Sequence, residues 1–455
     1  MTTNPPPLFA HQKLSINMLK KVPIVFDMSD PGTGKTRAGI EAFAARRRKG
    51  GKCHMVLAPK SLLASAWKED YEKYAPDMVC VIADAAHREE AFNMPADVYI
   101  TNHDAVKWVA KQKPAFFKKF DTLDIDESTA YKHHTSQRSK AAAKIAKNFT
   151  YRRLASGTAN SNCITDLWHQ MMIVDGGKRL GTSFYAFRSA ACDPIQTGPG
   201  AGHITWIDKP NIENIVGALL KDVVIRHVFE ECVDIPKNHK YAVSYTLGKS
   251  HMKAYEEMAE EQLLLHKNKV ITAVNAASLS TKLLQIASGA VYNGEDDYVL
   301  LDSGRYEMIL DLIEARDHTV TFFNWKHQRD ELVKEAEKRG ISFAVYDGST
   351  KDKEREQIVT DFQAGKLRTI FAHPQSAGHG LTLTRGCATI WASPTYNLEH
   401  FAQGWKRVHR IGQKRKTETI MVIAKDTLDE RVWEVLQNKE AKMADLLREI
   451  RELTK

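Results

Sequence analysis

The chain has 455 residues, a net charge of +9 at pH 7 and a pI of about 9.0. Its hydrophobic content of 43% and charged content of 27% are typical of a globular protein with two or three domains, and the basic excess favours a polyanionic partner. The six cysteines form no CxxC pair, which argues against a zinc site and a disulfide framework. The sequence shows neither an apolar signal core nor a membrane-length apolar run, so we expect a cytoplasmic protein without a membrane anchor.

The first predicted strand leads into a loop of small residues. Ile24–Phe26 is an apolar run, residues 29–34 read SDPGTG, and Lys35-Thr36 opens a predicted helix over 37–49. Such a loop points several N–H groups at one anion, the lysine adds a positive charge, and the threonine hydroxyl is a Mg²⁺ ligand. Ser29 replaces the first glycine of G-x-x-x-x-G-K-[ST]. The pattern predicts a site for ATP and Mg²⁺ with these residues: Asp30, Gly32, Thr33, Gly34, Lys35 and Thr36.

Strands and helices alternate along most of the chain, which predicts parallel sheets flanked by helices. A first series has strands over 54–58, 79–82, 97–100, 122–125, 150–154 and 223–226, with a helix over 61–74. A second series has strands over 319–323, 342–346, 368–372, 389–392 and 419–423, and helices over 327–339, 353–363, 398–408 and 428–453. We therefore expect an α/β fold with two lobes, 1–235 (helical over about 162–235) and 236–455 (with a helical lead-in over about 245–315).

An acidic pair follows the apolar strand at 122–125. Asp126 is suited to hold Mg²⁺ through its water shell, and Glu127 to orient and deprotonate an attacking water. An acidic pair alone is common on protein surfaces. Its position at a strand end, downstream of the GKT loop, makes a catalytic role the better interpretation.

The segment 403–413 reads QGWKRVHRIGQ and lies in the second lobe. Gln403, Arg407 and Arg410 are spaced by four and three residues, which predicts that one helix face carries all three. A guanidinium group suits the charge that develops during γ-phosphoryl transfer. Arg407 and Arg410 are therefore predicted catalytic residues, together with Lys35, Asp126 and Glu127, and hydrolysis would require closure of the two lobes.

Taken together, these motifs resemble the superfamily-two helicases and translocases, specifically their Swi/Snf branch. The similar segments run through nearly the whole chain: Phe9–Gln12, Ser29–Thr36, Leu57–Leu63 with Trp67–Glu69, Ile100–His103, Asp126–Thr129, Ser156–Asn160, Phe323–Trp325, Asp347–Thr350 with Arg355, Ser376–Leu381 and His409–Gln413. The resemblance implies two RecA-like lobes with ATP between them and duplex DNA across them. It also adds Gln12, Gly378 and Gln403 to the nucleotide site.

The resemblance further implies contacts with the DNA backbone that do not depend on base sequence. The residues that it places on nucleic acid are Pro59, Lys60, Thr101, Asn102, Ser156, Thr158, Asn324, Trp325, Ser349 and Ser376. A compact motor of a bacterium or a phage is expected, in the host cytoplasm if phage-encoded. The sequence is compatible with a monomer and leaves protein partners open.

The sequence departs from the branch's pattern at a few positions. Ser128-Thr129 stands where Ala-His is usual, so the coupling between the acidic pair and the segment 156–160 is expected to differ. Trp67, Trp168 and Trp405 are interpreted as core or interface packing rather than as stacking platforms. A duplex translocase is the leading interpretation; the alternatives are a strand-separating or branch-migrating helicase and an ATP-gated nucleic-acid clamp without motor activity.

Overall fold

The computed structural model describes residues 5–160, 162–196, 204–267, 273–292, 297–377 and 381–454. Its contacts divide the chain into two compact units. The first comprises Met1–Asp193, Asp208–Asp234 and Ala441–Lys455, and the second comprises Pro194–Ile207 and Ile235–Glu440. Among the described residues, no helix combines the length and the apolar character that crossing a bilayer requires.

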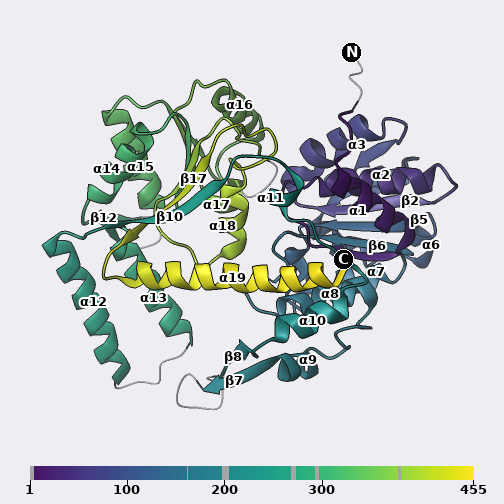
Figure 1. Ribbon diagram of the computed structural model, residues 1–455, viewed down its shortest axis with the longest axis horizontal. Coiled ribbons are helices and arrows are strands. Elements are labelled where there is room, and N and C mark those ends of the chain that lie inside the picture. Colours follow the sequence, from purple (N-terminus) through teal and green to yellow (C-terminus); the bar gives the residue numbers. More distant parts are fainter. Residues whose placement is uncertain are drawn as a thin grey trace. The chain divides into compact units, whose positions relative to one another are not determined.

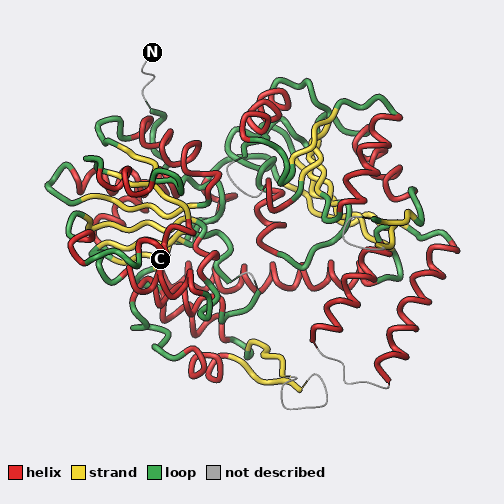
Figure 2. Tube along the Cα trace, turned by 180° about the vertical axis from the view of Figure 1, so that it is seen from behind, coloured by secondary structure: helices red, strands yellow, loops and turns green. Residues whose placement is uncertain are grey.

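The first unit is built on a seven-stranded sheet with the strand order β3-β4-β2-β5-β6-β1-β9 (Figure 1). All its pairings are parallel, and helices flank it (Figure 2). The strands are β1 (Ile24–Asp27), β2 (Cys53–Ala58), β3 (Cys80–Ile82), β4 (Val98–Asn102), β5 (Phe120–Asp126), β6 (Tyr151–Ala155) and β9 (Val224–Ile225). The main helices are α1 (Ala10–Lys21), α2 (Lys35–Arg47), α3 (Glu69–Tyr74), α4 (Arg88–Asn93), α7 (Gln137–Ala146), α8 (Asp166–Asp175), α9 (Phe184–Ala191) and α10 (Ile212–Leu220).

The second unit is built on a six-stranded sheet with the order β10-β17-β16-β13-β15-β14, again parallel throughout. Its strands are β10 (Asn238–Tyr245), β13 (Thr319–Phe322), β14 (Phe343–Tyr346), β15 (Thr369–Ala372), β16 (Ala388–Trp391) and β17 (Thr417–Ala424). Its main helices are α12 (Lys249–Lys267), α13 (Ala273–Ala287), α14 (Gly304–Glu314), α15 (Lys326–Lys338), α16 (Asp352–Gln363) and α18 (Leu398–Trp405), and α19 (Leu428–Thr454) begins there. The predicted fold class, two mainly parallel α/β sheets, is confirmed.

Three details differ from the sequence-based expectation. The strand β10 was not predicted; it lies between the two stretches expected to be helical, and it pairs with β17 along its full length. Its residues are mostly half-buried or exposed, because it is an edge strand, so it lacks the apolar run by which inner strands are found. The predicted helix over 61–74 is divided into three helical types. Two short two-stranded sheets were also not predicted: β7 (Cys192–Gln196) pairs with β8 (Ile204–Asp208), and β11 (Ala290–Tyr292) pairs with β12 (Tyr298–Leu300).

The register of the first sheet brings three loops together. Asp27 at the end of β1 is level with Ala155 at the end of β6, and Ala155 is level with Asp126 at the end of β5. Parallel strands end at one edge of the sheet, where ligands bind in folds of this kind. The loop 28–34, the acidic pair and the segment 156–160 therefore leave the sheet side by side.

Candidate nucleotide site and nucleic-acid interface

The loop between β1 and α2 is closed on itself by its own lysine. Lys35 Nζ donates to the carbonyl oxygens of Ser29 (2.7 Å) and Asp30 (3.0 Å). Gly34 has φ = 81°, and a Cβ added there would lie 2.1 Å from Nε2 of Gln12. The left-handed backbone favours glycine at this position, and a side chain there would also displace the amide of Gln12. Gln12 Nε2 also donates to the carbonyl oxygen of Thr33 at 3.4 Å, so two predicted nucleotide-site segments are in contact.

Asp30 anchors this loop to the segment that follows β9. Its carboxylate accepts from Arg226 Nη1 at 2.6 Å and from the backbone N–H of Phe229 at 3.0 Å. The N–H of His227 donates to Ser29 Oγ at 3.1 Å. Arg226 was not found from the sequence because about two hundred residues separate it from its partner, and no local pattern marks it.

A buried ion network lies beneath the loop. Arg153 on β6 donates from Nη2 to Asp27 Oδ2 (3.0 Å) and to the carbonyl oxygen of Lys35 (2.7 Å), and from Nη1 to Asp124 Oδ2 (3.0 Å). Burial by itself would raise the pKa of Asp124, but the interactions with His54 and Arg153 outweigh it and lower that pKa to about 2. The network fixes the first residue of α2 to the sheet, and none of its charges was predicted as part of the site.

The two residues of the acidic pair differ in local geometry: Asp126 is described by the hydrogen bonds of its carboxylate, and Glu127 by its backbone conformation. Asp126 Oδ1 accepts from the N–H of Glu127 (3.1 Å), and Oδ2 accepts from Nε1 of Trp67 (3.0 Å). Burial raises the pKa of Asp126, while the bond from Trp67 and the charges of Arg153 and Lys35 oppose that rise. Glu127 has φ = 48°, a left-handed conformation that is uncommon for a long side chain and that is concentrated at functional sites.

Lys35 shares its surroundings with these carboxylates. Burial lowers the pKa of its ammonium group, and the opposing attraction comes from Asp27, Glu127, Asp126 and Asp30. The lysine therefore lies within the field of four carboxylates of the first unit. Thr36, in the first turn of α2, and Asp126 offer a hydroxyl and a carboxylate, the oxygen ligands that Mg²⁺ prefers. The residues present thus fit a magnesium–nucleotide complex.

The departure at Ser128 is compensated by a glutamine. Ser128 Oγ donates to Gln170 Oε1 at 2.7 Å, and Gln170 Nε2 donates to the carbonyl oxygens of Ala159 (2.7 Å) and Asp166 (2.9 Å). Ser128 and Gln170 are both fully buried. The acidic pair is therefore linked to the segment 156–160 through a neutral side chain on α8, which the sequence alone did not indicate.

In the second unit, the predicted helix face carrying Gln403, Arg407 and Arg410 is not formed. The helix α18 ends at Trp405, and the N–H of Arg407 bonds to the carbonyl of Gly404 in a tighter turn. Both arginines instead donate to the carbonyl oxygen of Leu381, Arg407 Nη1 at 3.5 Å and Arg410 Nη1 at 3.0 Å. The spacing prediction was wrong because it assumed that the helix continues through this segment.

Gln413 replaces the helix as the support of this segment. Its Nε2 donates to the carbonyl oxygens of Thr384, Gly386 and Val408 (2.9–3.1 Å). Its Oε1 accepts from the N–H groups of Lys414 and Arg415. One buried amide thus ties the segment 381–386 to the segment 403–415, where both arginines lie. Gly378, predicted for the nucleotide site, lies outside the described residues.

The residues predicted on nucleic acid differ in exposure. Lys60 and Ser349 are exposed, and Asn102, Asn324, Trp325 and Ser376 are half-buried. By contrast, the side chains of Thr101, Ser156 and Thr158 are almost completely buried, as is Pro59. Thr101 Oγ1 donates to the carbonyl of Ala83 at 2.6 Å, which is a role inside the fold. In this conformation those buried side chains offer no surface to DNA.

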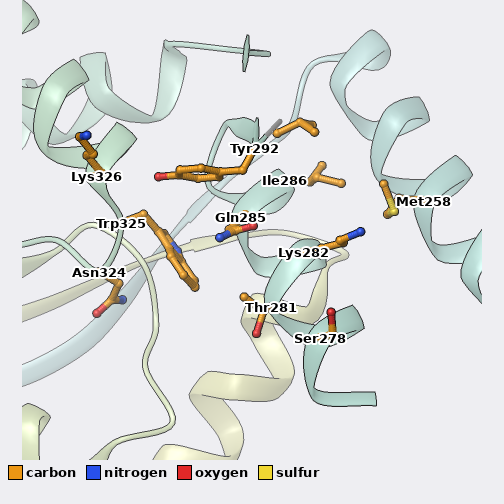
Figure 3. A pocket seen from close by; sticks show the side chains of 11 residues that line it. Met258, Ser278, Thr281, Lys282, Gln285, Ile286, Tyr292, Asn324, Trp325 and Lys326 are labelled. Atoms are coloured by element: carbon orange, nitrogen blue, oxygen red, sulfur yellow. The ribbon is translucent and has the colours of Figure 1, made fainter. Parts of the chain in front are cut away.

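A cavity of about 810 Å³ adjoins Asn324 and Trp325 (Figure 3). In Figure 3 the indole of Trp325 lies opposite Gln285 and Thr281 of α13. The cavity is lined by Met258, Ser278, Thr281, Lys282, Gln285, Ile286, Val291, Tyr292, Asn324, Trp325 and Lys326. Lys282 and Lys326 are exposed cations that the sequence did not single out. Cations and aromatic rings beside amide groups are the side-chain types that bind nucleic-acid backbones and bases.

Comparison with known proteins identifies two matching family profiles. Residues 9–161 match "Type III restriction enzyme, res subunit", and residues 304–412 match "Helicase conserved C-terminal domain". The matched ranges contain the loop 28–34 and the acidic pair in the first unit, and both arginines in the second.

Several relatives are similar over most of the chain. Putative protein p41 of Acyrthosiphon pisum secondary endosymbiont phage 1 is 29% identical over 96% of this chain and 97% of its own length. An uncharacterized ATP-dependent helicase of Mycoplasma genitalium is 24% identical over 90% of this chain and 39% of its own length. A SWI/SNF-related matrix-associated actin-dependent regulator of chromatin subfamily A-like protein 1 homolog of Caenorhabditis elegans is 23% identical over 95% of this chain. The chain spans 61% of that relative's length.

A solved structure is similar in architecture. The SWI2/SNF2 ATPase core of Sulfolobus solfataricus in complex with dsDNA aligns over 98% of this chain and 94% of its own, with 22% identity and a TM-score of 0.45.

Proposed function

Because the chain is a Swi/Snf-like member of the superfamily-two helicases, we propose that it hydrolyses ATP to ADP and phosphate when duplex DNA is bound, and that it moves along that DNA. The observation that carries the proposal is the common edge of β1, β5 and β6. There the loop with Lys35, the acidic pair Asp126-Glu127 and the segment 156–160 leave the sheet at one level.

In this proposal the residues at the carboxyl edge of the first sheet have separate roles. Lys35 exchanges its bonds to the carbonyls of Ser29 and Asp30 for bonds to phosphate oxygens. Glu127 orients a water molecule and accepts its proton as the oxygen attacks the γ-phosphorus, while Asp126 and Thr36 hold the metal. Bound Mg²⁺ supplies charge neutralisation at the phosphate oxygens.

In the second unit, Arg407 and Arg410 stabilise the negative charge that develops on the transferred phosphoryl group. In the structure both guanidinium groups meet at the carbonyl of Leu381. A shared acceptor of this kind holds two cations close together without neutralising them. That arrangement supports a joint role towards one polyanionic ligand.

DNA is proposed to contact exposed and half-buried residues at the carboxyl ends of strands. In the first unit these are Lys60 and Asn102, and in the second they are Asn324, Trp325, Ser349 and Ser376. We add Lys282 and Lys326, which flank the cavity at Trp325. Contacts of this type are made with phosphates, so affinity should fall steeply with salt and vary little with base sequence.

The test is ATP turnover by the full chain with no nucleic acid, duplex DNA, single-stranded DNA or RNA. We expect the largest stimulation by duplex DNA. Glu127→Gln should lower kcat by roughly 10²–10⁴-fold, because it removes a general base without changing its size. Glu90→Gln, an exposed change on α4, is the control. Stimulation by single strands but not by duplex would contradict the translocase; an unchanged rate in Glu127→Gln would contradict the catalytic assignment.

The DNA surface is tested separately by the double variant Lys282→Ala/Lys326→Ala. Removing two phosphate contacts should weaken duplex binding at low salt and reduce the slope of log K against log salt by about 2. ATP turnover without DNA should stay at the wild-type rate. An unchanged salt slope would remove this cavity from the proposed DNA surface.

A further inference from the structure

The chain between β2 and α3 passes through three helical types. A 3₁₀ turn covers Lys60–Leu62, a π-helical turn covers Leu63–Lys68, and α3 follows from Glu69. The N–H of Glu69 bonds to the carbonyl of Ala64, which is the i→i−5 bond of a π-turn. Such turns are rare and occur frequently at functional sites. This one begins three residues after the exposed Lys60.

The π-turn directs Trp67 at the acidic pair. Trp67 is 1% exposed, and its Nε1–H donates to Asp126 Oδ2 at 3.0 Å. The other oxygen of that carboxylate accepts from the N–H of Glu127. Each oxygen of the Asp126 carboxylate therefore accepts a hydrogen bond from a fixed donor, and the two bonds together set the orientation of the carboxylate plane.

The indole itself is held from behind by two rings. His54 lies edge-on to it at 6.2 Å between centroids, and Tyr71 lies at 6.4 Å. His54 Nδ1 and the phenol oxygen of Tyr71 share a hydrogen bond of 2.6 Å. Both rings are fully buried, so Trp67 cannot turn away from Asp126 without disrupting the core.

A second tryptophan shows what an ordinary buried indole does. Trp168 on α8 is 6% exposed, and its Nε1–H donates to the backbone carbonyl of Gly181 at 3.1 Å. A neutral carbonyl is sufficient to satisfy an indole N–H. Trp67 instead donates to the carboxylate of Asp126 at the end of the central strand β5. A hydrogen bond to a charged acceptor is stronger than one to a neutral carbonyl, so it constrains the orientation of that acceptor more.

We infer that Trp67 is a positioning residue for the metal-holding carboxylate. It orients Asp126 for the magnesium–nucleotide complex, and it makes the segment from Lys60 to Lys68, with its proposed DNA contact, mechanically continuous with the hydrolysis site. The inference rests on the proposed function. It gives a physical path, through the segment from Lys60 to Trp67, by which DNA binding at Lys60 changes the geometry of the acidic pair.

The test compares Trp67→Phe with Trp168→Phe, which loses an indole N–H bond to a backbone carbonyl. Binding of Mn²⁺ to the full chain is measured by electron paramagnetic resonance in the presence of a non-hydrolysable ATP analogue. Loss of a residue that orients a metal ligand typically reduces metal affinity by roughly 10–100-fold, and we expect a reduction in that range for Trp67→Phe only. In turnover assays the Mg²⁺ concentration at half-maximal rate should rise for Trp67→Phe and stay at the wild-type value for Trp168→Phe.

A purely structural role for Trp67 would give Trp67→Phe the same Mn²⁺ affinity as Trp168→Phe, and that result would overturn the inference. Trp67→His, which keeps an N–H donor on a smaller ring, should recover part of the affinity. If Trp67→Phe does not fold, 3-benzothienylalanine at position 67 repeats the test with the same shape and no donor. Failure of the wild-type chain to hydrolyse ATP would instead refute the proposed function.

Discussion

The two units support their functional loops by different chemistry. In the first, the loop with Lys35 rests on buried charges, Arg153 between Asp27 and Asp124. In the second, the segment with Arg407 and Arg410 rests on one neutral amide, that of Gln413. The second unit also contains a buried ion pair, Arg305 with Asp429 at 2.7 Å, but this pair lies at the first turn of α19.

This difference in supporting side chains predicts how each loop responds to mutation and to pH. Buried ion pairs fix geometry strongly and are costly to break, because the remaining charge stays desolvated. A neutral amide with five hydrogen bonds is less costly to lose and does not titrate. The loop with Lys35 should therefore be the more rigid and the more pH-sensitive of the two, and the arginine segment the more adaptable.

The largest expected effect comes from Arg153→Met. It removes the guanidinium partner of the buried carboxylates Asp27 and Asp124, and it should lower the free energy of unfolding by about 3–5 kcal/mol. Arg305→Met breaks the other buried pair and should cost a similar amount. Only Arg153→Met should also weaken binding of a fluorescent ATP analogue, since Arg153 holds the carbonyl of Lys35. Equal nucleotide affinity in the two folded variants would remove the distinction between the units.

Gln413→Leu should have the next largest effect. It removes the donors to three carbonyls and the acceptor for two N–H groups, with a cost of roughly 2–3 kcal/mol. Because the arginine segment loses its support, kcat for ATP should fall while affinity for the ATP analogue stays near the wild-type value. Thermal unfolding and steady-state kinetics measure the two quantities. A loss of nucleotide affinity without a loss of kcat would contradict the assignment of this segment to catalysis.

The buried carboxylate Asp124 predicts a pH dependence. Its pKa is about 2 in the folded chain against a usual value of 3.8, and this depression contributes about 2 kcal/mol of stability above pH 4. That stability is lost as the pH falls from about 4 to about 2. The difference in free energy of unfolding between the wild type and Asp124→Asn should therefore shrink over this interval. A constant difference would show that folding does not lower the pKa of Asp124.

The smallest effect is expected in the second sheet. Thr319 donates to Thr369 at 2.9 Å, and both side chains are fully buried. Thr369 also shares a hydrogen bond with the buried Thr321 hydroxyl at 3.2 Å. Replacing all three threonines by valine removes every donor and acceptor of this group and leaves no charge, so the change in unfolding free energy should be within about 1 kcal/mol. Urea unfolding measures it. A loss of unfolding free energy comparable with that of Arg153→Met would mean that the removal of buried polar groups destabilises both sheets equally.

Local sequence patterns predicted the inner strands and their loops well. Apolar runs such as the one at Ile24 identify β1, and the small residues after it predict a phosphate-binding loop. The edge strand β10 was missed because its half-exposed residues carry no apolar run. The end of α18 was misplaced because Gln413 binds the carbonyl of Val408, just beyond the turn at Gly404–Arg407, and helical spacing cannot reveal this contact.

Local patterns in the sequence were therefore sufficient to predict the two-sheet fold, the chemical types at the strand ends and the family resemblance. They were sufficient because each of these depends on residues adjacent in the chain, where periodicity and glycine content act directly. Only the tertiary structure decided which side chains hold the site in place: Arg153, Arg226, Gln170 and Trp67. Their bonds to Asp27, Asp30, Ser128 and Asp126 span 42 to 196 residues of the chain, and packing brings these partners within hydrogen-bonding distance.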